Sequence, residues 1–324
     1  MGLKEFLNEW CEPSDRLLVH TSGSTGQPKP LWVEKRRMEA SARITCQFLG
    51  LKAGDTALLC LPLDYIAGKM MVVRALTCGL RLISVEPSGH PLAGVTEPIS
   101  FAAMIPLQVY NSLRVEAERR RLMQIAHLII GGGAVDDDLA RGLKDFPNAV
   151  WSTYGMTETL SHIALRRLSG PEASQWYTPF PSVSVSLNAD GCLVIDAPQV
   201  CPETLTTNDI AEMADGRFRI IGRRDNVVCS GGIKIQIEEV ERRLHGHTEA
   251  PLLITKRPDQ RLGQALVLLT TSREAADELR RLCPQVLPRY WQPRDYLVVD
   301  RLPLTPTGKP ARGEAERMAV MAGG

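Results

Sequence analysis

Short apolar runs alternate with helical patterns through the first half of this 324-residue chain. The run Arg16–His20 enters a loop of glycine, serine and threonine, and Lys35–Leu49 then has the pattern of a helix that ends at Gly50. This alternation predicts a largely parallel sheet covered by helices, and therefore an α/β fold. The further predicted strands are Thr56–Leu61, Arg81–Val85, Phe101–Ile105, His127–Ile130 and Ala149–Thr153, and the predicted helices include Met70–Cys78 and Val115–Gln124.

A different pattern begins near Ser182, where short strands separated by turn residues replace the alternation. From Gly222 onward helices and strands mix again over about 100 residues, a length typical of a compact domain. We therefore expect a large α/β domain with a small β-rich subdomain at residues 1–221, and a mobile α+β domain at residues 222–324. The elements predicted in these parts are strands Val183–Leu187, Cys192–Ile195, Arg217–Ile221, Leu252–Thr255, Ala265–Thr270 and Asp295–Val299, and helices Ile237–His245 and Glu274–Cys283.

The composition argues against several classes of protein. Lys and Arg number 38 against 37 Asp and Glu, so the chain lacks the basic field that binds nucleic acid. The eight cysteines form no C-x-x-C pair, which argues against a zinc cage or a disulfide framework. The first residues lack the pattern of a targeting segment, and the apolar runs are too short to cross a bilayer. We expect a cytoplasmic protein that does not bind membranes.

The loop after the first predicted strand is dense in groups that bind phosphate. Glycines let backbone N–H groups approach an anion, hydroxyls add donors, and a lysine supplies charge. The spacing is not that of a Walker A loop, and a flexible surface turn is the alternative interpretation. The candidate phosphate-binding residues are Thr21, Ser22, Gly23, Ser24, Thr25, Gly26 and Lys29.

This loop and the segments that follow it resemble the ordered motifs of the adenylate-forming superfamily, which includes acyl-CoA and aryl-CoA ligases. The string Tyr154-Gly-Met-Thr-Glu-Thr159 is the most specific of these likenesses, and Gly222–Glu241 resembles the family's hinge between its two domains. Together the motifs span almost the whole chain. The other matching segments are Leu61–Gly68 of the acyl pocket, Gly131–Ala134 of the adenine side, Thr207–Asp209 of the ribose site, and Pro303–Lys309 with the catalytic lysine.

The resemblance implies an ATP-dependent reaction with ATP, Mg²⁺ and coenzyme A as the ligands. A carboxylate attacks the α-phosphate of ATP to give an acyl-adenylate and pyrophosphate, and the thiol of coenzyme A then displaces AMP. In this scheme Lys309 stabilises the charge that develops during adenylation, Thr157 donates to the α-phosphate, and Glu158 holds the metal. The nucleotide-binding residues implied are Gly131, Gly132, Gly133, Tyr154 and Gly155 at the adenine, and Asp209 and Arg223 at the ribose.

The hinge position falls on Asp225, which suggests that the C-terminal domain rotates between the two half-reactions. The resemblance places Ser230, Gly231 and Gly232 beside the channel for the thiol. Taken singly, these matches have simpler interpretations: Asp209 could be a helix N-cap, Arg223 a surface ion pair and Lys309 an exposed turn lysine.

The chain departs from the family in two places. Members usually carry one to two hundred residues before the phosphate loop, whereas 20 precede Thr21 here. We therefore expect a truncated large domain whose open face is covered by other means, such as a homo-oligomer. In the pocket segment, the usual aromatic-histidine pair is replaced by Asp64 and Tyr65. Tyr65 retains an aromatic gate for the pocket.

Lys69 and Arg74 lie on an otherwise apolar helical stretch, where a buried cation needs a partner. A substrate with a second carboxylate would supply one; alternatively, both side chains reach the surface. Together with a general likeness to the o-succinylbenzoate:CoA ligases of menaquinone biosynthesis, this favours o-succinylbenzoate as the acid. His162 follows Glu158 at helical spacing, and we expect it to be a pocket or packing residue rather than a metal ligand.

Other functions stay open from the sequence. The chain could be another aryl- or acyl-CoA ligase, or an enzyme that loads an acyl group onto a carrier protein. A degenerate nucleotide-binding regulator is the alternative outside the enzymes. The presence of Lys309 argues against the regulator, because a lysine that acts only during adenylation has no use in a pure binder.

Overall fold

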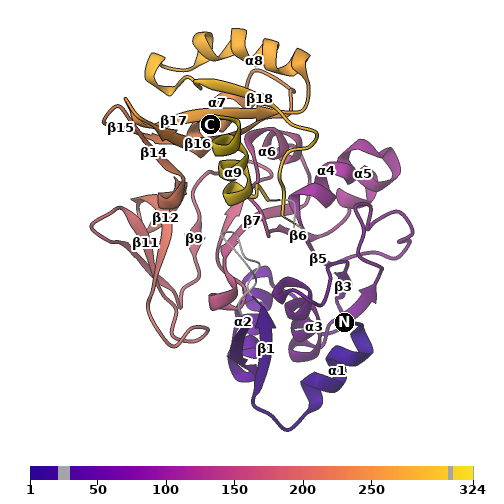
Figure 1. Cartoon of the computed structure of the whole chain (residues 1–324). Helices are drawn as coiled ribbons and strands as arrows, with labels where there is room; N and C mark the ends of the chain where they lie inside the picture. Colours follow the sequence, from indigo (N-terminus) through magenta and orange to yellow (C-terminus); the bar gives the residue numbers. More distant parts are fainter. Residues whose placement is uncertain (21–29, 306–308, 324) are drawn as a thin grey trace.

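The computed structural model describes residues 1–20, 30–305 and 309–323 (Figure 1). Its centre is a seven-stranded sheet of order β4-β3-β5-β6-β7-β8-β9. The first five strands pair in parallel, and β8 and β9 extend the sheet antiparallel. The largely parallel sheet predicted from the sequence is therefore confirmed. The strands are β3 (Thr56–Leu59), β4 (Arg81–Ser84), β5 (Phe101–Met104), β6 (His127–Ile130), β7 (Ala149–Gly155), β8 (His162–Arg167) and β9 (Thr178–Pro179).

Helices cover both faces of this sheet. Figure 1 shows α2 and α3 on one side and α4, α5 and α6 on the other, so the strands between them are buried on both faces. This explains why the strand sequences are continuous apolar runs rather than alternating ones. The bounds are α2 (Lys35–Leu49), α3 (Ile66–Cys78), α4 (Pro106–Arg114), α5 (Glu116–Leu122) and α6 (Asp137–Leu143); a further helix, α1 (Leu3–Cys11), begins the chain.

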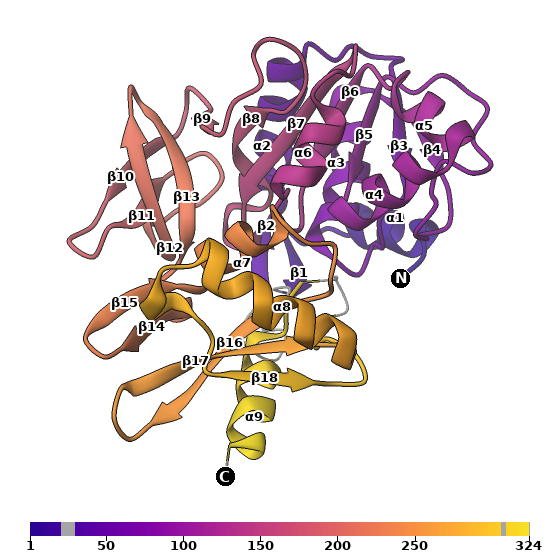
Figure 2. The same cartoon turned by 90° about the horizontal axis from the view of Figure 1, so that it is seen from above.

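A four-stranded antiparallel sheet of order β10-β11-β12-β13 lies beside the central sheet (Figure 2). The backbone of Tyr177 pairs with that of Phe218 and joins the two sheets, with N–H to O distances of 2.7 and 3.1 Å. This is the small β-rich subdomain expected from the turns. Its strands are β10 (Ser184–Leu187), β11 (Cys192–Asp196), β12 (Leu205–Ala214) and β13 (Arg217–Arg223).

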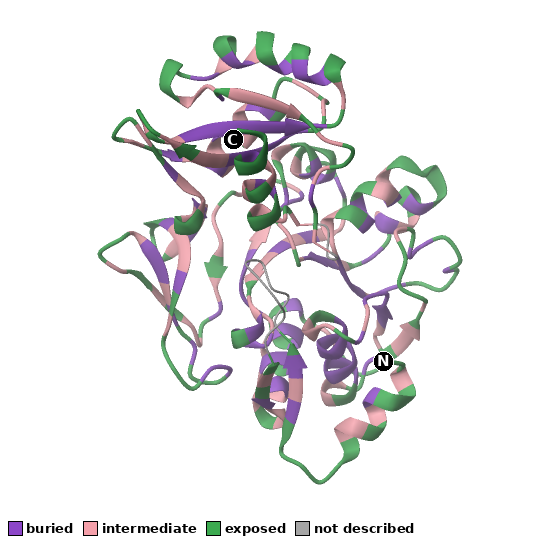
Figure 3. Ribbon diagram, in the orientation of Figure 1, coloured by how far each residue is buried: buried purple, intermediate pink, exposed green. Residues whose placement is uncertain are grey.

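The C-terminal part is an α+β unit built on a five-stranded sheet. Its buried residues form clusters that contain Val228 and residues beyond it, whereas the main core includes buried residues up to Phe218. Figure 3 shows buried strands at the centre of both parts. Separate apolar cores thus lie on either side of residue 222, and the division into domains expected there stays a prediction. The elements are β14 (Val227–Ser230), β15 (Ile233–Gln236), β16 (Leu253–Asp259), β17 (Gly263–Thr270), β18 (Asp295–Val298), α7 (Ile237–His245), α8 (Arg273–Val286) and α9 (Arg312–Ala322).

No helix among the described ranges has both the length and the apolar character that a membrane span requires.

An ion pair fixes the start of α9, three residues after Lys309. Arg312 donates from Nη1 and Nη2 to the two carboxylate oxygens of Glu241 at 2.6 Å each, and from Nη1 to the carbonyl of Ile254 at 2.7 Å. The backbone N–H of Ile254 in turn donates to Glu241. Burial works against the charge on Arg312, but the hydrogen bonds and charge of Glu241 leave its pKa raised overall. The pair therefore ties the lysine-bearing segment to α7 and β16.

We expect Arg312→Met to lower the free energy of unfolding by about 3 kcal/mol, because it leaves the Glu241 carboxylate without its charged partner. Urea unfolding of the full chain measures the change. Arg317→Met removes an exposed arginine from the same helix and should change stability little. If the free energy of unfolding falls equally in the two variants, the ion pair between Arg312 and Glu241 does not stabilise the protein.

Candidate active site

The predicted phosphate-binding residues Thr21, Ser22, Gly23, Ser24, Thr25, Gly26 and Lys29 lie outside the described residues. The two strands that flank them are described, and β1 (Arg16–His20) pairs antiparallel with β2 (Pro30–Glu34). His20 is directly opposite Pro30 in this ladder. The two ends of the predicted loop therefore lie next to each other, between a strand that leads in and a strand that leads to α2.

Asp209 lies at the centre of a group of polar side chains contributed by three strands. Tyr154 at the end of β7 donates from Oη to one carboxylate oxygen at 2.6 Å, and Arg223 on β13 donates from Nη1 to the other at 3.0 Å. Asp209 lies in β12 opposite Arg223, so it is a strand residue and the alternative of a helix N-cap is wrong. Burial and then the Asp209 charge raise the pKa of Tyr154, which keeps its hydroxyl protonated as a donor.

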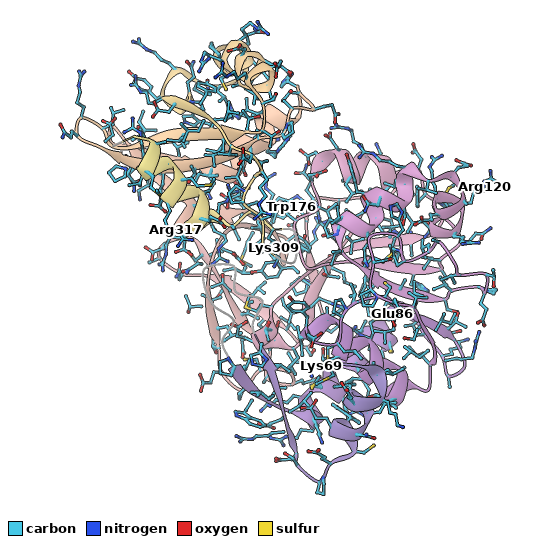
Figure 4. All side chains as sticks on the ribbon, turned by 45° about the vertical axis from the view of Figure 1, so that its right-hand side comes forward. Lys69, Glu86, Arg120, Trp176, Lys309 and Arg317 are labelled. Carbon is cyan, nitrogen blue, oxygen red and sulfur yellow. The ribbon has the colours of Figure 1, made fainter. Side chains whose placement is uncertain are left out.

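Lys309, which is labelled in Figure 4, comes from the C-terminal unit, and the charges of Arg223 and Asp209 act on it. Burial and the positive charge of Arg223 lower the pKa of Lys309, while the charge of Asp209 opposes that shift. Its backbone is held by Thr305, whose N–H donates to the Lys309 carbonyl at 2.7 Å and whose hydroxyl accepts from the Lys309 N–H. Lys309 is therefore partly buried among charged groups and is not the exposed turn lysine of the simpler interpretation.

The glycine turn at 131–133 follows β6, at the same sheet edge where β7 ends in Tyr154. A Cβ on Gly131 would lie 2.4 Å from Oγ1 of Thr153, so no larger residue fits there without displacing that side chain. Gly132 has a φ of +79°, in the left-handed region that favours glycine. Parallel sheets bind ligands at the carboxyl ends of their strands, and the structure brings Gly131, Gly132 and Gly133 to that edge together with Tyr154.

The segment after Tyr154 makes a sharp reversal. A Cβ on Gly155 would lie 2.3 Å from the carbonyl oxygen of Ser161, so the two backbones touch at a glycine. Thr157 is buried in a 3-10 turn at Thr157–Thr159, while Glu158 is exposed. Leu160 has a φ of +65°, which ends the turn and starts β8 at His162. The spacing of Glu158 and His162 suggested that both lie on one helix, and this is wrong because the chain reverses between them.

No group of three or more acidic, histidine or cysteine side chains that could hold a metal exists within the described part of the chain. Glu158 nevertheless suits Mg²⁺, which is commonly bound through one or two carboxylates with water and substrate phosphates as the other ligands.

Asp225 lies in the short 3-10 turn Arg224–Asn226 between β13 and β14. Its carboxylate accepts from Nη2 of Arg223 at 3.2 Å and from Nδ2 of Asn208 at 3.1 Å. Lys256 of the C-terminal sheet donates to the Asp225 carbonyl at 3.1 Å. The predicted hinge residue thus contacts both parts of the chain, and its neighbour Arg223 joins it to Asp209.

Ser230, Gly231 and Gly232 form the tight turn between β14 and β15. Gly231 and Gly232 have φ values of +57° and +81°, the combination that a two-residue hairpin turn requires. Gly231 also donates its N–H to the carbonyl of Leu262, in the connection between β16 and β17. The turn belongs to the C-terminal sheet, and its assignment to a thiol channel stays a prediction.

Tyr65, Lys69 and Arg74 lie at or within α3, and both cations are buried with 3% and 2% of their surface exposed. The alternative that these side chains reach the surface is therefore wrong. Lys69 already has a partner within the chain: its Nζ lies 3.6 Å from a carboxylate oxygen of Glu9 and 5.0 Å from the centre of the Phe6 ring. Figure 4 shows Lys69 far from Lys309, in the region of the first helices.

Arg74 differs from Lys69, because no ion pair joins its guanidinium to a carboxylate of the described residues. Nη2 donates to Oγ of Ser161 at 2.6 Å, Nη1 lies 3.7 Å from the sulfur of Met71, and Nε has no partner in this part of the chain. Burial lowers the pKa of Arg74 to about 10. A charged side chain this deeply buried, with an unused donor, points to an anion that residues 1–20, 30–305 and 309–323 do not provide.

Sequence reasoning missed Ser161 and Thr45, and it described His162 only as a pocket or packing residue. His162 is buried, with Oγ1 of Thr45 at 3.2 Å and Oγ of Ser161 at 3.1 Å from its two ring nitrogens. Burial and then the charge of Arg74 hold the pKa of His162 well below its usual range. The apolar run from His162 to Leu165 was the available signal that this segment is a buried strand.

Known proteins resemble the chain over nearly its whole length. A 2-succinylbenzoate–CoA ligase of Listeria monocytogenes is 24% identical over 96% of this chain and 71% of its own length. The enzyme of the same name from Escherichia coli is 27% identical over 86% of this chain and 63% of its own length. The chain thus spans roughly two thirds of the length of these relatives.

Solved structures share the fold. An acyl-CoA synthetase (AMP-forming)/AMP-acid ligase II-like protein from Dyadobacter fermentans is 34% identical, with a TM-score of 0.65, over 97% of this chain and 92% of its own. The o-succinylbenzoate coenzyme A synthetase of Bacillus subtilis, in complex with ATP and magnesium ion, is 22% identical, with a TM-score of 0.76, over 92% of this chain and 69% of its own.

The AMP-binding enzyme family matches residues 4–203, and the C-terminal domain of AMP-binding enzymes matches residues 239–309. The first match alone covers more than half of the chain, and it includes Tyr154, Thr157 and Glu158. The chain therefore belongs to the family of AMP-binding enzymes.

Proposed function

We propose that the protein is an AMP-forming acid–thiol ligase that converts o-succinylbenzoate to its coenzyme A thioester with ATP and Mg²⁺. The observation that carries the reaction is the convergence of Tyr154, Asp209 and Arg223 with Lys309, which comes from a separate part of the chain. The relatives named as 2-succinylbenzoate–CoA ligases support the choice of acid.

The polar group around Asp209 suits a nucleotide. Among the described residues, one oxygen of the Asp209 carboxylate accepts from Tyr154 and the other from Arg223, and a carboxylate oxygen has room for a second hydrogen bond. Both oxygens therefore remain able to accept from the ribose hydroxyls of ATP. The glycine turn at Gly131 leaves space beside Tyr154 for the base, and Glu158 would hold Mg²⁺, which supplies charge neutralisation at the phosphates.

Lys309 and Thr157 act on the bonds that change during adenylation. A carboxylate oxygen of the acid attacks the α-phosphorus, and the bond to the pyrophosphate oxygen breaks. Lys309 stabilises the negative charge that accumulates between the two reactants, and Thr157 donates a hydrogen bond to an α-phosphate oxygen. In the second step the thiol sulfur attacks the acyl carbon, and AMP leaves with its phosphate oxygen.

The second step requires the thiol to reach a site that Lys309 occupies during the first. We infer that the C-terminal unit rotates about Asp225, and that the turn at Ser230–Gly232 then lines the thiol channel. The contacts of Asp225 with both parts of the chain support this position for the hinge.

Arg74 supports an acid with two carboxyl groups. Its buried guanidinium is without a carboxylate partner among the described residues, so the second carboxylate of o-succinylbenzoate would neutralise it while the first is activated. Lys69 is assigned no substrate role, because Glu9 already pairs with it. Tyr65 begins α3 at the same segment and stays a candidate for the pocket wall.

Release of AMP and pyrophosphate with ATP, Mg²⁺ and coenzyme A, measured over a panel of acids, tests the proposal. Turnover with o-succinylbenzoate well above that with benzoates and fatty acids is the expected result. Activity with other acids alone would contradict the choice of acid, and AMP release without coenzyme A dependence would favour a carrier-loading enzyme. If no acid leads to release of AMP or pyrophosphate, the result would favour the nucleotide-binding regulator.

We expect Lys309→Ala to slow adenylation by about 100-fold, because it removes a positive charge from the point where negative charge develops. Single-turnover formation of the acyl-adenylate measures this rate, and equilibrium dialysis with ATP should give an affinity close to that of the parent. The exposed Lys52→Ala serves as the matched control. Equal pyrophosphate release by Lys309→Ala and the parent would rule out the assigned role.

We expect Arg74→Met to raise the KM for o-succinylbenzoate by about 10- to 100-fold, because a charge-assisted hydrogen bond to the second carboxylate is lost. The KM for ATP should stay unchanged. Arg119→Met, at an exposed arginine of α5, is the control for loss of a guanidinium. An unchanged KM for the acid in Arg74→Met would remove the reason for assigning a dicarboxylic substrate.

A further inference from the structure

A chain of hydrogen bonds runs from the Arg74 guanidinium to the backbone of α2. Nη2 of Arg74 lies 2.6 Å from Oγ of Ser161, which lies 3.1 Å from Nδ1 of His162. Nε2 of His162 lies 3.2 Å from Oγ1 of Thr45, and the Thr45 hydroxyl lies 3.1 Å from the carbonyl oxygen of Ser41. We call these five residues the Arg74 chain. It joins α3, the segment before β8, and α2, which are distant in sequence.

The chemistry of the end groups determines the direction of every bond. A carbonyl oxygen only accepts, so the single hydroxyl hydrogen of Thr45 goes to Ser41. Nε2 of His162 must then donate to Thr45, and Nδ1 of the neutral ring is left as an acceptor for the Ser161 hydroxyl. Ser161 has used its hydrogen, so its oxygen accepts from Arg74, which donates only. The chain therefore requires one tautomer of His162, neutral with hydrogen on Nε2.

The Arg74 chain uses only Nη2 of the guanidinium and leaves the N–H groups of Nε and Nη1 available. Nε is buried without a partner among the described residues, and Nη1 contacts the sulfur of Met71, a weak acceptor, at 3.7 Å. The guanidinium is packed in the core, 5.9 Å from the centre of the Phe101 ring, and a hydrogen bond to a hydroxyl that is itself held adds a directional constraint to that packing. The unpartnered donors thus point in a direction that Ser161 and its supports determine.

We propose that Ser161, His162 and Thr45 are positioning residues that hold the Arg74 guanidinium ready for the second carboxylate of the acid. This inference rests on the proposed ligase function and goes beyond it, because it assigns selectivity between dicarboxylic and monocarboxylic acids to residues that need not touch the substrate. Preorganisation of this kind stabilises the complex by reducing the ordering that binding would otherwise require.

The kinetic test uses Thr45→Val, which keeps the shape of the side chain and removes the hydroxyl, and Ser161→Ala. Acids are o-succinylbenzoate and its two analogues that lack one carboxyl, 4-oxo-4-phenylbutanoate and 2-butanoylbenzoate. We expect the KM for o-succinylbenzoate to rise about tenfold in both variants, with kcat and the KM for ATP and for any monocarboxylic acid turned over nearly unchanged. Thr45→Ser, which keeps the hydroxyl, should retain most of the parent's selectivity for o-succinylbenzoate over the monocarboxylic acids.

Thr270→Val is the matched control, because Thr270 is also buried and donates to a backbone carbonyl, that of Pro251 at 2.6 Å, in the C-terminal unit. It should leave the selectivity between acids unchanged. If Thr45→Val and Ser161→Ala lower kcat/KM equally for all acids, or only lower the thermal unfolding midpoint, the chain is merely structural and the inference is overturned.

Nuclear magnetic resonance of protein labelled with ¹⁵N-histidine tests the chain independently of the substrate. The signal that disappears in His162→Gln should show, near neutral pH, a neutral ring with hydrogen on Nε2. An imidazolium, or hydrogen on Nδ1, would overturn the inference even if the ligase function holds. If instead the parent does not prefer o-succinylbenzoate while the tautomer is as expected, the proposed acid fails and the positioning role for that acid fails with it.

Discussion

The Asp209 carboxylate is the interaction on which the arrangement of the site depends. It accepts from Tyr154 at the end of the central sheet and from Arg223 on the neighbouring strand of the β-rich subdomain. Arg223 also donates to Asp225 at the junction with the C-terminal unit, and Lys309 lies in the field of the same charges. One carboxylate thus links the central sheet to the β-rich subdomain directly, and to the junction with the C-terminal unit through Arg223. Without its charge the half-buried Tyr154 and Arg223 side chains would each lose a hydrogen bond.

Two cations on α3 show how position decides the role of a side chain. Lys69 and Arg74 are one and a half turns apart, and both are almost completely buried. Lys69 faces α1, where Glu9 and the Phe6 ring compensate its charge. Arg74 faces the segment that reverses after Tyr154, where it donates to the Ser161 hydroxyl, and no carboxylate in the described part of the chain pairs with it. Two buried cations on one helix therefore have different roles: Lys69 forms a structural ion pair, and Arg74 is a candidate anion-binding group.

Local patterns predicted the regular elements well where burial and periodicity agree. The helices Lys35–Leu49 and Ile237–His245 have the predicted bounds, because an apolar face at helical spacing meets a partner surface in each. Strand β12 was not predicted as a strand, and its residues Thr207–Asp209 were singled out only as a ribose-binding motif. Its polar residues conceal a strand that pairing with β11 and β13 stabilises. The spacing of Glu158 and His162 suggested a possible helix, because periodicity does not reveal a single left-handed residue such as Leu160.

The sequence by itself determined the family and the α/β class, and it predicted the residues that gather around Asp209, because short motifs of glycine, hydroxyl and charge are specific in their order along the chain. Only the tertiary structure decided which cations are partnered and that Ser161, His162 and Thr45 form one chain with Arg74. These contacts join residues up to 117 positions apart. A hydrogen bond depends on distance and direction between atoms, and neither is encoded by spacing along the sequence when the chain reverses between them.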